Sequence, residues 1–332
     1  MGEFIMKKFL YAPIVLSFVF SAGNSLAENV YMKEDIVPCY NTFMCTVNGD
    51  PITGVVKDYY MNGVLKDEGN YEDGLLNGFA KTYYENGNLK SEEIYKNGIK
   101  CCLSKTYYEN GNLEVEGTIK NGKIDGIVKG YYESGKLMLE EIYKNGIKDG
   151  ITKGYYESGR LWSEETYKDG QREGVFTVYY ENGTLKVEGY HRNGKLEGLI
   201  KTYYENGHLE TEGMFKEGEM NGFSKHYYEN GNLRSEGFLK DGKINGSSKI
   251  YYKNGLLMAE ETYKDGKLDG LNKKYYENGN LKREVKYKGG KPISGYIYDS
   301  LGQQKLMTND ELSYLKTGSA SLKNMDNLSD FY

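Results

Sequence analysis

One feature constrains this chain more than any other: a segment built on a Tyr-Tyr pair returns ten times at a fixed spacing. The pairs begin at Tyr59, Tyr83, Tyr107, Tyr131, Tyr155, Tyr179, Tyr203, Tyr227, Tyr251 and Tyr275, so each step is 24 residues (83 − 59) with no insertion. A fixed period between 20 and 50 residues indicates a repeat array, in which each unit buries its surface mainly on its neighbours.

Four positions in each copy never vary, and in the second copy they are Gly87, Leu89, Glu92 and Gly98. Both glycines usually follow Asn, Asp or Ser, and an Asn-Gly pair between short aromatic and β-branched runs is a strong hairpin signal. No window shows a sustained 3.6-residue apolar period, which argues against helices. The sequence therefore predicts an all-β fold: an elongated, single-layer antiparallel β-meander built from 24-residue hairpin repeats.

Counting outward from a two-residue turn at Asn86-Gly87 predicts the register of the strands. Tyr84 then faces Leu89, and Lys81 faces the invariant Glu92; lysine holds the Lys81 position in nine of the ten copies. We expect these opposite charges to form a ladder on one face that fixes the register. The same counting places Gly117 opposite Gly126.

The composition limits what such a chain can bury and bind. Only 38% of the residues are hydrophobic, whereas 34 are tyrosine and 43 are glycine, so no thick aliphatic core is expected. The formal net charge is −5, with lysines and glutamates interspersed. This pattern argues against a nucleic-acid partner or an anionic-membrane surface.

The N-terminal 27 residues are predicted to be a secretory signal peptide. Two lysines precede the apolar run 9–20, and Ser25-Leu26-Ala27 supplies small residues at a cleavage site after Ala27. Residues 1–5 are either an upstream start or a cloning remnant. The mature chain contains no other apolar segment long enough to span a bilayer, and we expect an exported protein that is periplasmic, secreted or at the cell surface.

The mature chain is predicted to have three parts. Residues 28–45 form an N-terminal cap, in which Cys39 and Cys45 are expected to form a small disulfide loop. Residues 46–298 form the repeat array. Residues 299–332 hold a degenerate repeat, a short helix that begins with the capping box Thr308–Glu311 and covers the last edge strand, and a loose tail.

The sequence does not predict an enzyme, because its motif-like segments lack residues that catalysis or cofactor binding requires. Residues 117–123 (GTIKNGK) match part of a phosphate-binding loop, but Ile124 replaces the required Ser or Thr and no helix follows. Adjacent carboxylates such as Glu92-Glu93 point to opposite faces of a strand and would not share a substrate. Cys101 and Cys102 stand where other copies have Asp-Gly, and the three histidines fall in different repeats, so neither a metal site nor a cofactor is predicted.

The segments Tyr95–Gly98 (YKNG) and 122–126 (GKIDG), with the Tyr-Tyr-x-Asn-Gly-x-Leu-x-x-Glu half of the copy, resemble the MORN repeat in its bacterial variant. The resemblance extends over roughly 46–298 and implies a β-meander used for protein or lipid contact and scaffolding. Many bacterial relatives are described as YwqK-type antitoxins and some carry phosphatidylinositol-phosphate kinase names, but nothing here resembles a kinase domain and the signal peptide departs from a cytoplasmic antitoxin.

We expect a non-enzymatic interaction, adhesion or scaffold protein whose partner is another protein, on a host or neighbouring cell. The alternatives are a glycan or cell-wall binding module and an antitoxin-like neutraliser of a toxin. Aromatic side chains are enriched at interface hot spots. The predicted binding residues are the second tyrosines of seven successive pairs: Tyr84, Tyr108, Tyr132, Tyr156, Tyr180, Tyr204 and Tyr228. The competing interpretation is that these rings only cover the sheet.

Overall fold

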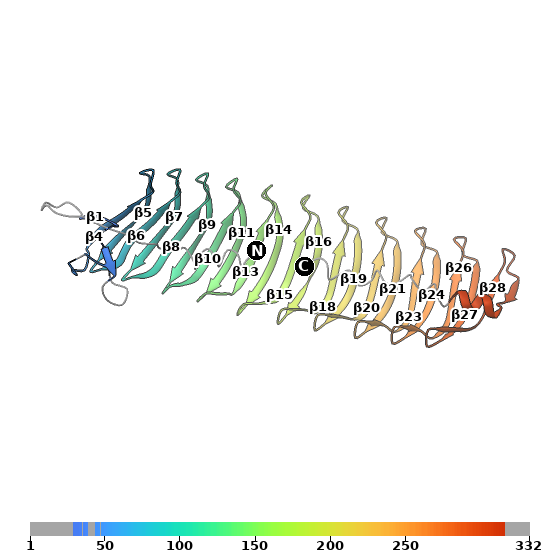
Figure 1. Cartoon of the computed structure of the whole chain (residues 1–332). Coiled ribbons are helices and arrows are strands. Elements are labelled where there is room, and N and C mark those ends of the chain that lie inside the picture. Colours follow the sequence, from blue (N-terminus) through green and yellow to red (C-terminus); the bar gives the residue numbers. More distant parts are fainter. Residues whose placement is uncertain (1–28, 35, 39–43, 47, 316–332) are drawn as a thin grey trace. The chain divides into compact units, whose positions relative to one another are not determined.

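The computed structural model describes residues 29–34, 36–38, 44–46 and 48–315 (Figure 1). It divides into two compact units with the boundary between Arg172 and Glu173, inside strand β15. Each unit is described by itself. The predicted signal peptide, Cys39 and the predicted tail lie outside the described residues.

The first unit is one antiparallel meander in which consecutive strands pair; where a bulge splits a strand into two segments, both segments pair with the strand before them (Figure 1). Its strands are β4 (Gly54–Tyr59), β5 (Leu65–Glu72), β6 (Leu75–Tyr83), β7 (Leu89–Lys96), β8 (Ile99–Tyr107), β9 (Leu113–Lys120), β10 (Lys123–Tyr131), β11 (Leu137–Lys144), β12 (Ile147–Lys148), β13 (Gly150–Tyr155) and β14 (Leu161–Lys168). Strand β1 (Val30–Met32) adds to β4 in parallel, and β2 (Ile36–Pro38) forms a separate hairpin with β3 (Met44–Thr46).

The second unit repeats the meander. Its strands are β15 (Gln171–Tyr179), β16 (Leu185–Arg192), β17 (Lys195–Leu196), β18 (Gly198–Tyr203), β19 (Leu209–Lys216), β20 (Glu219–Tyr227), β21 (Leu233–Lys240), β22 (Lys243–Ile244), β23 (Gly246–Tyr251), β24 (Leu257–Lys264), β25 (Lys267–Leu268), β26 (Gly270–Tyr275), β27 (Leu281–Lys288), β28 (Lys291–Tyr298) and β29 (Gln304–Leu306). Helix α2 (Asn309–Tyr314) follows. The all-β, single-layer antiparallel meander of 24-residue hairpin repeats is confirmed.

The two hairpins of each copy close differently. At Asn97-Gly98 both residues have positive φ, 49° and 76°, and Lys96 pairs with Ile99, so this is the two-residue turn that an Asn-Gly pair predicts. The other hairpin is longer. The Tyr84 N–H donates to the Asn88 carbonyl and the Gly87 N–H donates to the Tyr84 carbonyl, with only Gly87 at positive φ.

This longer loop corrects the predicted register at one end of the strand. Lys81 faces Glu92 as expected, but Leu89 pairs with Tyr83, and Tyr84 lies in the loop. A two-residue turn was the wrong assignment there because a type I turn followed by a left-handed glycine takes one residue more.

A second irregularity is a β-bulge in the strand that follows each two-residue turn. Gly117 pairs with Val128, so its predicted pairing with Gly126 is wrong. Gly126 lies in the bulge at φ 114°, a conformation that favours glycine. The extra residues of a bulge are unpaired, which simple counting along a regular ladder cannot anticipate.

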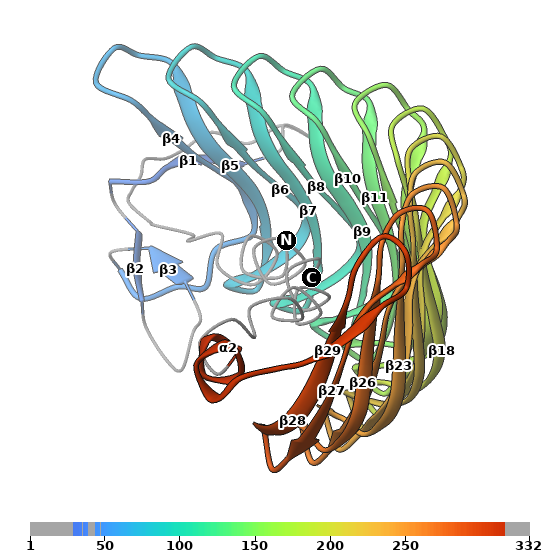
Figure 2. The same ribbon diagram turned by 90° about the vertical axis from the view of Figure 1, so that its right-hand side faces the viewer.

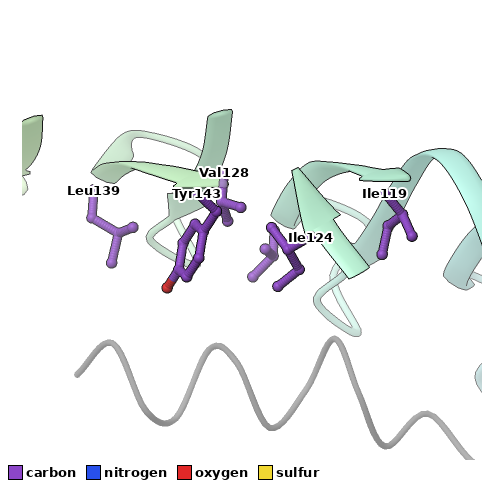
Figure 3. Close-up of a cluster of buried hydrophobic side chains, with 6 residues drawn as sticks. Ile119, Ile124, Val128, Leu139 and Tyr143 are labelled. Carbon is purple, nitrogen blue, oxygen red and sulfur yellow. The ribbon is translucent and has the colours of Figure 1, made fainter. Parts of the chain in front are cut away.

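The strands of each unit are curved (Figure 2). The two faces of the sheet differ in the side chains that they bury. We call the face that carries the buried side chains the inner face and the face that carries the Lys-Glu pairs the outer face. Ile119, Ile124, Val128 and Tyr143 form one inner-face cluster together with Val115 and Leu139 (Figure 3). The core is therefore a series of small clusters between neighbouring strands, as the low hydrophobic content predicts.

Each unit has its own cap on the inner face. Ile36 and Met44 of the β2–β3 hairpin pack on Val56 and Tyr71 of the first unit. In the second unit, the predicted capping box starts α2: the Thr308 hydroxyl accepts from the Glu311 N–H, and the Glu311 carboxylate accepts from the Thr308 N–H. Leu312 packs with Val285 and Tyr287, so α2 lies on the sheet's face, while β29 forms its edge. The predicted position over the edge strand is thus corrected.

Candidate functional site

The second tyrosine of most pairs connects successive repeats. The hydroxyl of Tyr84 donates to the Tyr107 carbonyl at 2.7 Å, and that of Tyr108 donates to the Tyr131 carbonyl at 2.7 Å, in each case 23 residues ahead. The same bond is made by Tyr60, Tyr132, Tyr180, Tyr204, Tyr228 and Tyr252. In six of the seven predicted binding residues, the hydroxyl is therefore hydrogen-bonded to the next repeat.

The Asn of the same loop supplies a parallel contact. Asn86 Nδ2 donates to the Glu109 carbonyl, 23 residues ahead, while its Oδ1 accepts from the Asn88 N–H. Because the Tyr84 hydroxyl and Asn86 Nδ2 both reach the next repeat, this side of the sheet is held together by side chains as well as by the strand ladder. Tyr156 occupies the same loop position, where its N–H donates to the Arg160 carbonyl. A partner-binding role of the seven tyrosines stays a prediction.

The invariant glutamate binds two side chains on the outer face. Glu68 receives a hydrogen bond from the Tyr83 hydroxyl at 2.8 Å and faces Lys57 at 3.3 Å. Lys-Glu contacts between 3.2 and 3.8 Å recur in both units. Burial and the Glu68 contact raise the pKa of Tyr83 above its ordinary value. The predicted charge ladder is present, and the first tyrosine of several pairs bonds to its glutamates, a role that sequence reasoning missed.

The neighbouring position on the inner face divides eight of the ten repeats into two types; Glu261, seven residues before Leu268, and Val285 fit neither. In one type the residue is a buried glutamate: Glu141 accepts from the Tyr143 hydroxyl and forms an ion pair with Lys148. In the other type it is glycine, and an aliphatic side chain replaces the lysine; a Cβ added at Gly69 would lie 2.9 Å from Leu76 Cδ2. The sequence carries this signal, because Glu93, Glu141 and Glu165 are each followed seven residues later by Lys or Arg.

An exposed apolar residue on the outer face recurs with the 24-residue period, and we call this set the outer row. In the first unit it comprises Phe79, Leu103, Ile127 and Ile151, with exposed fractions of 50%, 39%, 49% and 43%. In the second unit it comprises Val175, Leu199, Phe223 and Leu271. The Lys81 ammonium lies 5.8 Å from the Phe79 ring centroid, which places the row beside the Lys-Glu pairs.

Cross-strand neighbours extend the outer row. Phe79 pairs with Ile94, Ile127 with Ile142, and Phe223 with Phe238, which is 49% exposed. Regularly exposed apolar side chains, on a face that also carries Lys-Glu pairs, form the main candidate site for a macromolecular partner. The sequence contains this row, but only the register shows that its members share a face with the charge ladder.

The family profile of the MORN repeat variant matches the chain ten times, at residues 52–73, 76–97, 103–121, 124–145, 148–169, 172–193, 196–217, 220–241, 244–265 and 268–288. The chain belongs to the MORN repeat variant family. MORN repeats fit a role in protein or membrane binding. Within the described residues no helix has the length and apolarity that crossing a bilayer requires.

No curated protein matches this MORN repeat chain. Among solved structures it is similar to TcdB2-TccC3-Cdc42, with 10% identity and a TM-score of 0.18 over 75% of this chain and 17% of that one. It is also similar to a Photorhabdus luminescens Tc holotoxin pore, with 15% identity and a TM-score of 0.20 over 76% and 15% of the two chains. TM-scores this low do not establish a shared fold, and the chain spans less than a fifth of either relative.

Proposed function

We propose that this MORN repeat protein is an exported, non-enzymatic interaction module that binds another protein through the outer row. The observation that carries the proposal is the contrast between two periodic sets of side chains. Hydroxyls of the loop tyrosines bond to the next repeat, whereas the apolar side chains of the outer row, such as Ile127 and Ile151, are exposed.

The chemistry of the outer face favours a protein over other partners. Its lysines lie beside glutamates, as Lys153 does with Glu164 at 3.2 Å, so the face offers little net positive charge to a nucleic acid or an anionic membrane. The row is mostly aliphatic, and aliphatic side chains do not stack on sugar rings as aromatic cages do. An apolar ridge on a protein partner, bordered by groups that tolerate both charge signs, fits this surface.

Export is part of the proposal and rests on the sequence. The basic start, apolar run and small residues before Ala27 are typical of a secretory signal. A fusion of residues 1–27 to a reporter enzyme that is active only outside the cytoplasm tests it; reporter activity supports export, and an uncleaved, inactive fusion contradicts it.

The binding face is tested by replacing two members of the outer row, Ile127→Ser with Ile151→Ser, in the mature chain. Partner capture from cell-surface extracts is compared with the matched variant Ile99→Ser with Ile147→Ser, whose residues are 56% and 50% exposed at the two-residue turns, outside the row. We expect capture of a specific protein to fall at least ten-fold in the row variant and to be unchanged in the turn variant.

Two outcomes would contradict the outer-row assignment. Equal capture by both variants would remove the row from the interface. Loss of capture in the variant Tyr156→Ser with Tyr180→Ser, at an unchanged melting temperature, would instead show that the loop tyrosines form the binding site.

A further inference from the structure

The adjacent residues Cys101 and Cys102 depart from the repeat at two positions at once. The Cys102 position lies in the β-bulge, and in the other nine copies it is glycine at positive φ, from 79° to 147°. Cys102 adopts φ 66° there. A residue with a Cβ is strained in this left-handed region, so packing of the repeat does not account for a cysteine at this point.

Cys101 gives up a contact that other copies make. The equivalent Asp125 accepts a hydrogen bond from the Asn145 N–H at 3.2 Å, and Glu173 accepts one from the Asn193 N–H at 2.7 Å, in each case joining the bulge to the next turn. A thiol is a weak acceptor and replaces that contact poorly. Neither cysteine therefore serves the purpose that its position has in the other repeats.

The two thiols are free and in contact. Their sulfurs lie 3.2 Å apart, Cys102 is exposed and Cys101 is partly exposed. The hydrogen bond with Cys102 raises the pKa of the Cys101 thiol above its ordinary value. Within the described residues no cluster of three or more His, Cys, Asp or Glu surrounds them, so the set suits two-electron thiol chemistry better than metal binding.

We propose that Cys101 and Cys102 form a reversible redox pair that reacts with disulfides, either of low molecular weight or on a protein. The exposed Cys102 thiolate attacks one sulfur of the disulfide, forms a mixed disulfide and releases the first thiolate. The Cys101 thiolate then attacks Cys102 Sγ, closes the Cys101–Cys102 bond and releases the second thiolate. The two thiol protons pass to the leaving thiolates, so the pair is oxidised by two electrons and the disulfide is reduced to two thiols.

Reversibility follows from the chain geometry. Consecutive Cα atoms lie about 3.8 Å apart, closer than the roughly 4.4–6.8 Å that disulfides prefer, so the closed ring is strained and easily reduced. Closure would also alter the bulge of β8, since Cys101 pairs with Ile94 on β7 and Cys102 with Ile119 on β9. The oxidation state of the pair would thus affect the pairing of β8 with both neighbouring strands.

The test equilibrates the mature protein with mixtures of glutathione and glutathione disulfide, followed by alkylation and tryptic digestion. Cleavage after Lys100 and Lys105 releases both cysteines on one peptide, CCLSK. We expect this peptide to lose two hydrogen atoms and all alkylation in oxidising mixtures, and to regain alkylation at both thiols in reducing ones. The Cys101→Ser variant should stop at the mixed disulfide of Cys102 with glutathione.

The matched control is Cys101→Asp with Cys102→Gly, which restores the sequence of other repeats and should fold without this redox response. Three results would overturn the proposal: thiols that stay alkylatable in every mixture, a wild-type chain that stops at the mixed disulfide, and oxidation that yields a covalent dimer through Cys102.

Discussion

The two tyrosines of the pair Tyr83-Tyr84 are adjacent in sequence and make different contacts. Tyr83 lies on the outer face and donates to Glu68 in the preceding repeat, whereas Tyr84 lies in the loop and donates to the Tyr107 carbonyl in the following one. A tyrosine ring on a sheet surface gives no sequence signal of which way its hydroxyl reaches. That the tyrosines bond to both the preceding and the following repeat could therefore be recognised only once the strand register was known.

Replacing Tyr108 by Phe removes the hydroxyl that donates to the Tyr131 carbonyl and keeps the ring. We expect a loss of about 0.5–1.5 kcal/mol in the free energy of unfolding, the usual net value of one hydrogen bond, measured by denaturant titration. Tyr59→Phe, at a ring that is 40% exposed, is the control and should change stability little. Equal effects of the two changes would show that the hydroxyl bond between repeats does not contribute.

At the scale of one hairpin, the Glu-Lys pair of one type of repeat can be replaced by the glycine and aliphatic residue of the other type. Lys148→Ile leaves the carboxylate of Glu141, whose side chain is 3% exposed, without its cation. We expect a loss at the lower end of the roughly 3–5 kcal/mol that breaking a buried pair costs, because the Lys148 side chain is 19% exposed. Adding Glu141→Gly converts the hairpin to the Gly-aliphatic type and should recover most of that loss.

This exchange is measured as a double-mutant cycle on melting or denaturant curves. Glu141→Gly alone serves as the fourth corner, since it leaves Lys148 without its carboxylate. Strictly additive effects of the two changes would contradict the interpretation that the two positions act as a pair.

The sequence predicts the strands and turns well wherever the 24-residue period determines them. Alternation and the Asn-Gly pairs give the strand order, the Lys81–Glu92 pairing and the two-residue turn at Asn97-Gly98. It does not predict the bulge at Gly126 or the longer loop after Tyr84, because each inserts a residue that a regular ladder lacks. The outer row depends on the same register, and so the candidate site could not be placed from sequence alone.

At the scale of the whole molecule, the repeated tyrosine contacts imply a shared response to high pH. Burial is the main cause, and a hydrogen bond to a glutamate the second, of the raised pKa of Tyr131, Tyr227 and Tyr251, which is about 12. A folded pKa above the unfolded value of about 10 stabilises the fold below pH 10, and this contribution is lost as the pH rises toward 12. Many equivalent sites would lose it over the same interval.

We therefore expect melting temperatures to be steady between about pH 7 and 9 and to fall steeply above about pH 10. Phenolate absorbance, followed in parallel, should appear together with unfolding. The Tyr131→Phe variant should shift this onset only slightly, because it removes one site among many. Full phenolate absorbance in a chain whose far-UV circular dichroism is still native would contradict the assignment of these hydroxyls to carboxylates.

Within each unit, the loop tyrosines that bond to the next repeat reach forward by 23 residues, as from Tyr204 to Tyr227. A gene encoding such a chain can gain or lose an internal block of 24 codons by crossing-over between copies, and the new junction presents the same donor to the same acceptor. A block whose length is not a multiple of 24 codons would misalign the donor and the acceptor. Unequal recombination can thus change the number of repeats, while the tyrosine contact between neighbouring repeats stays the same.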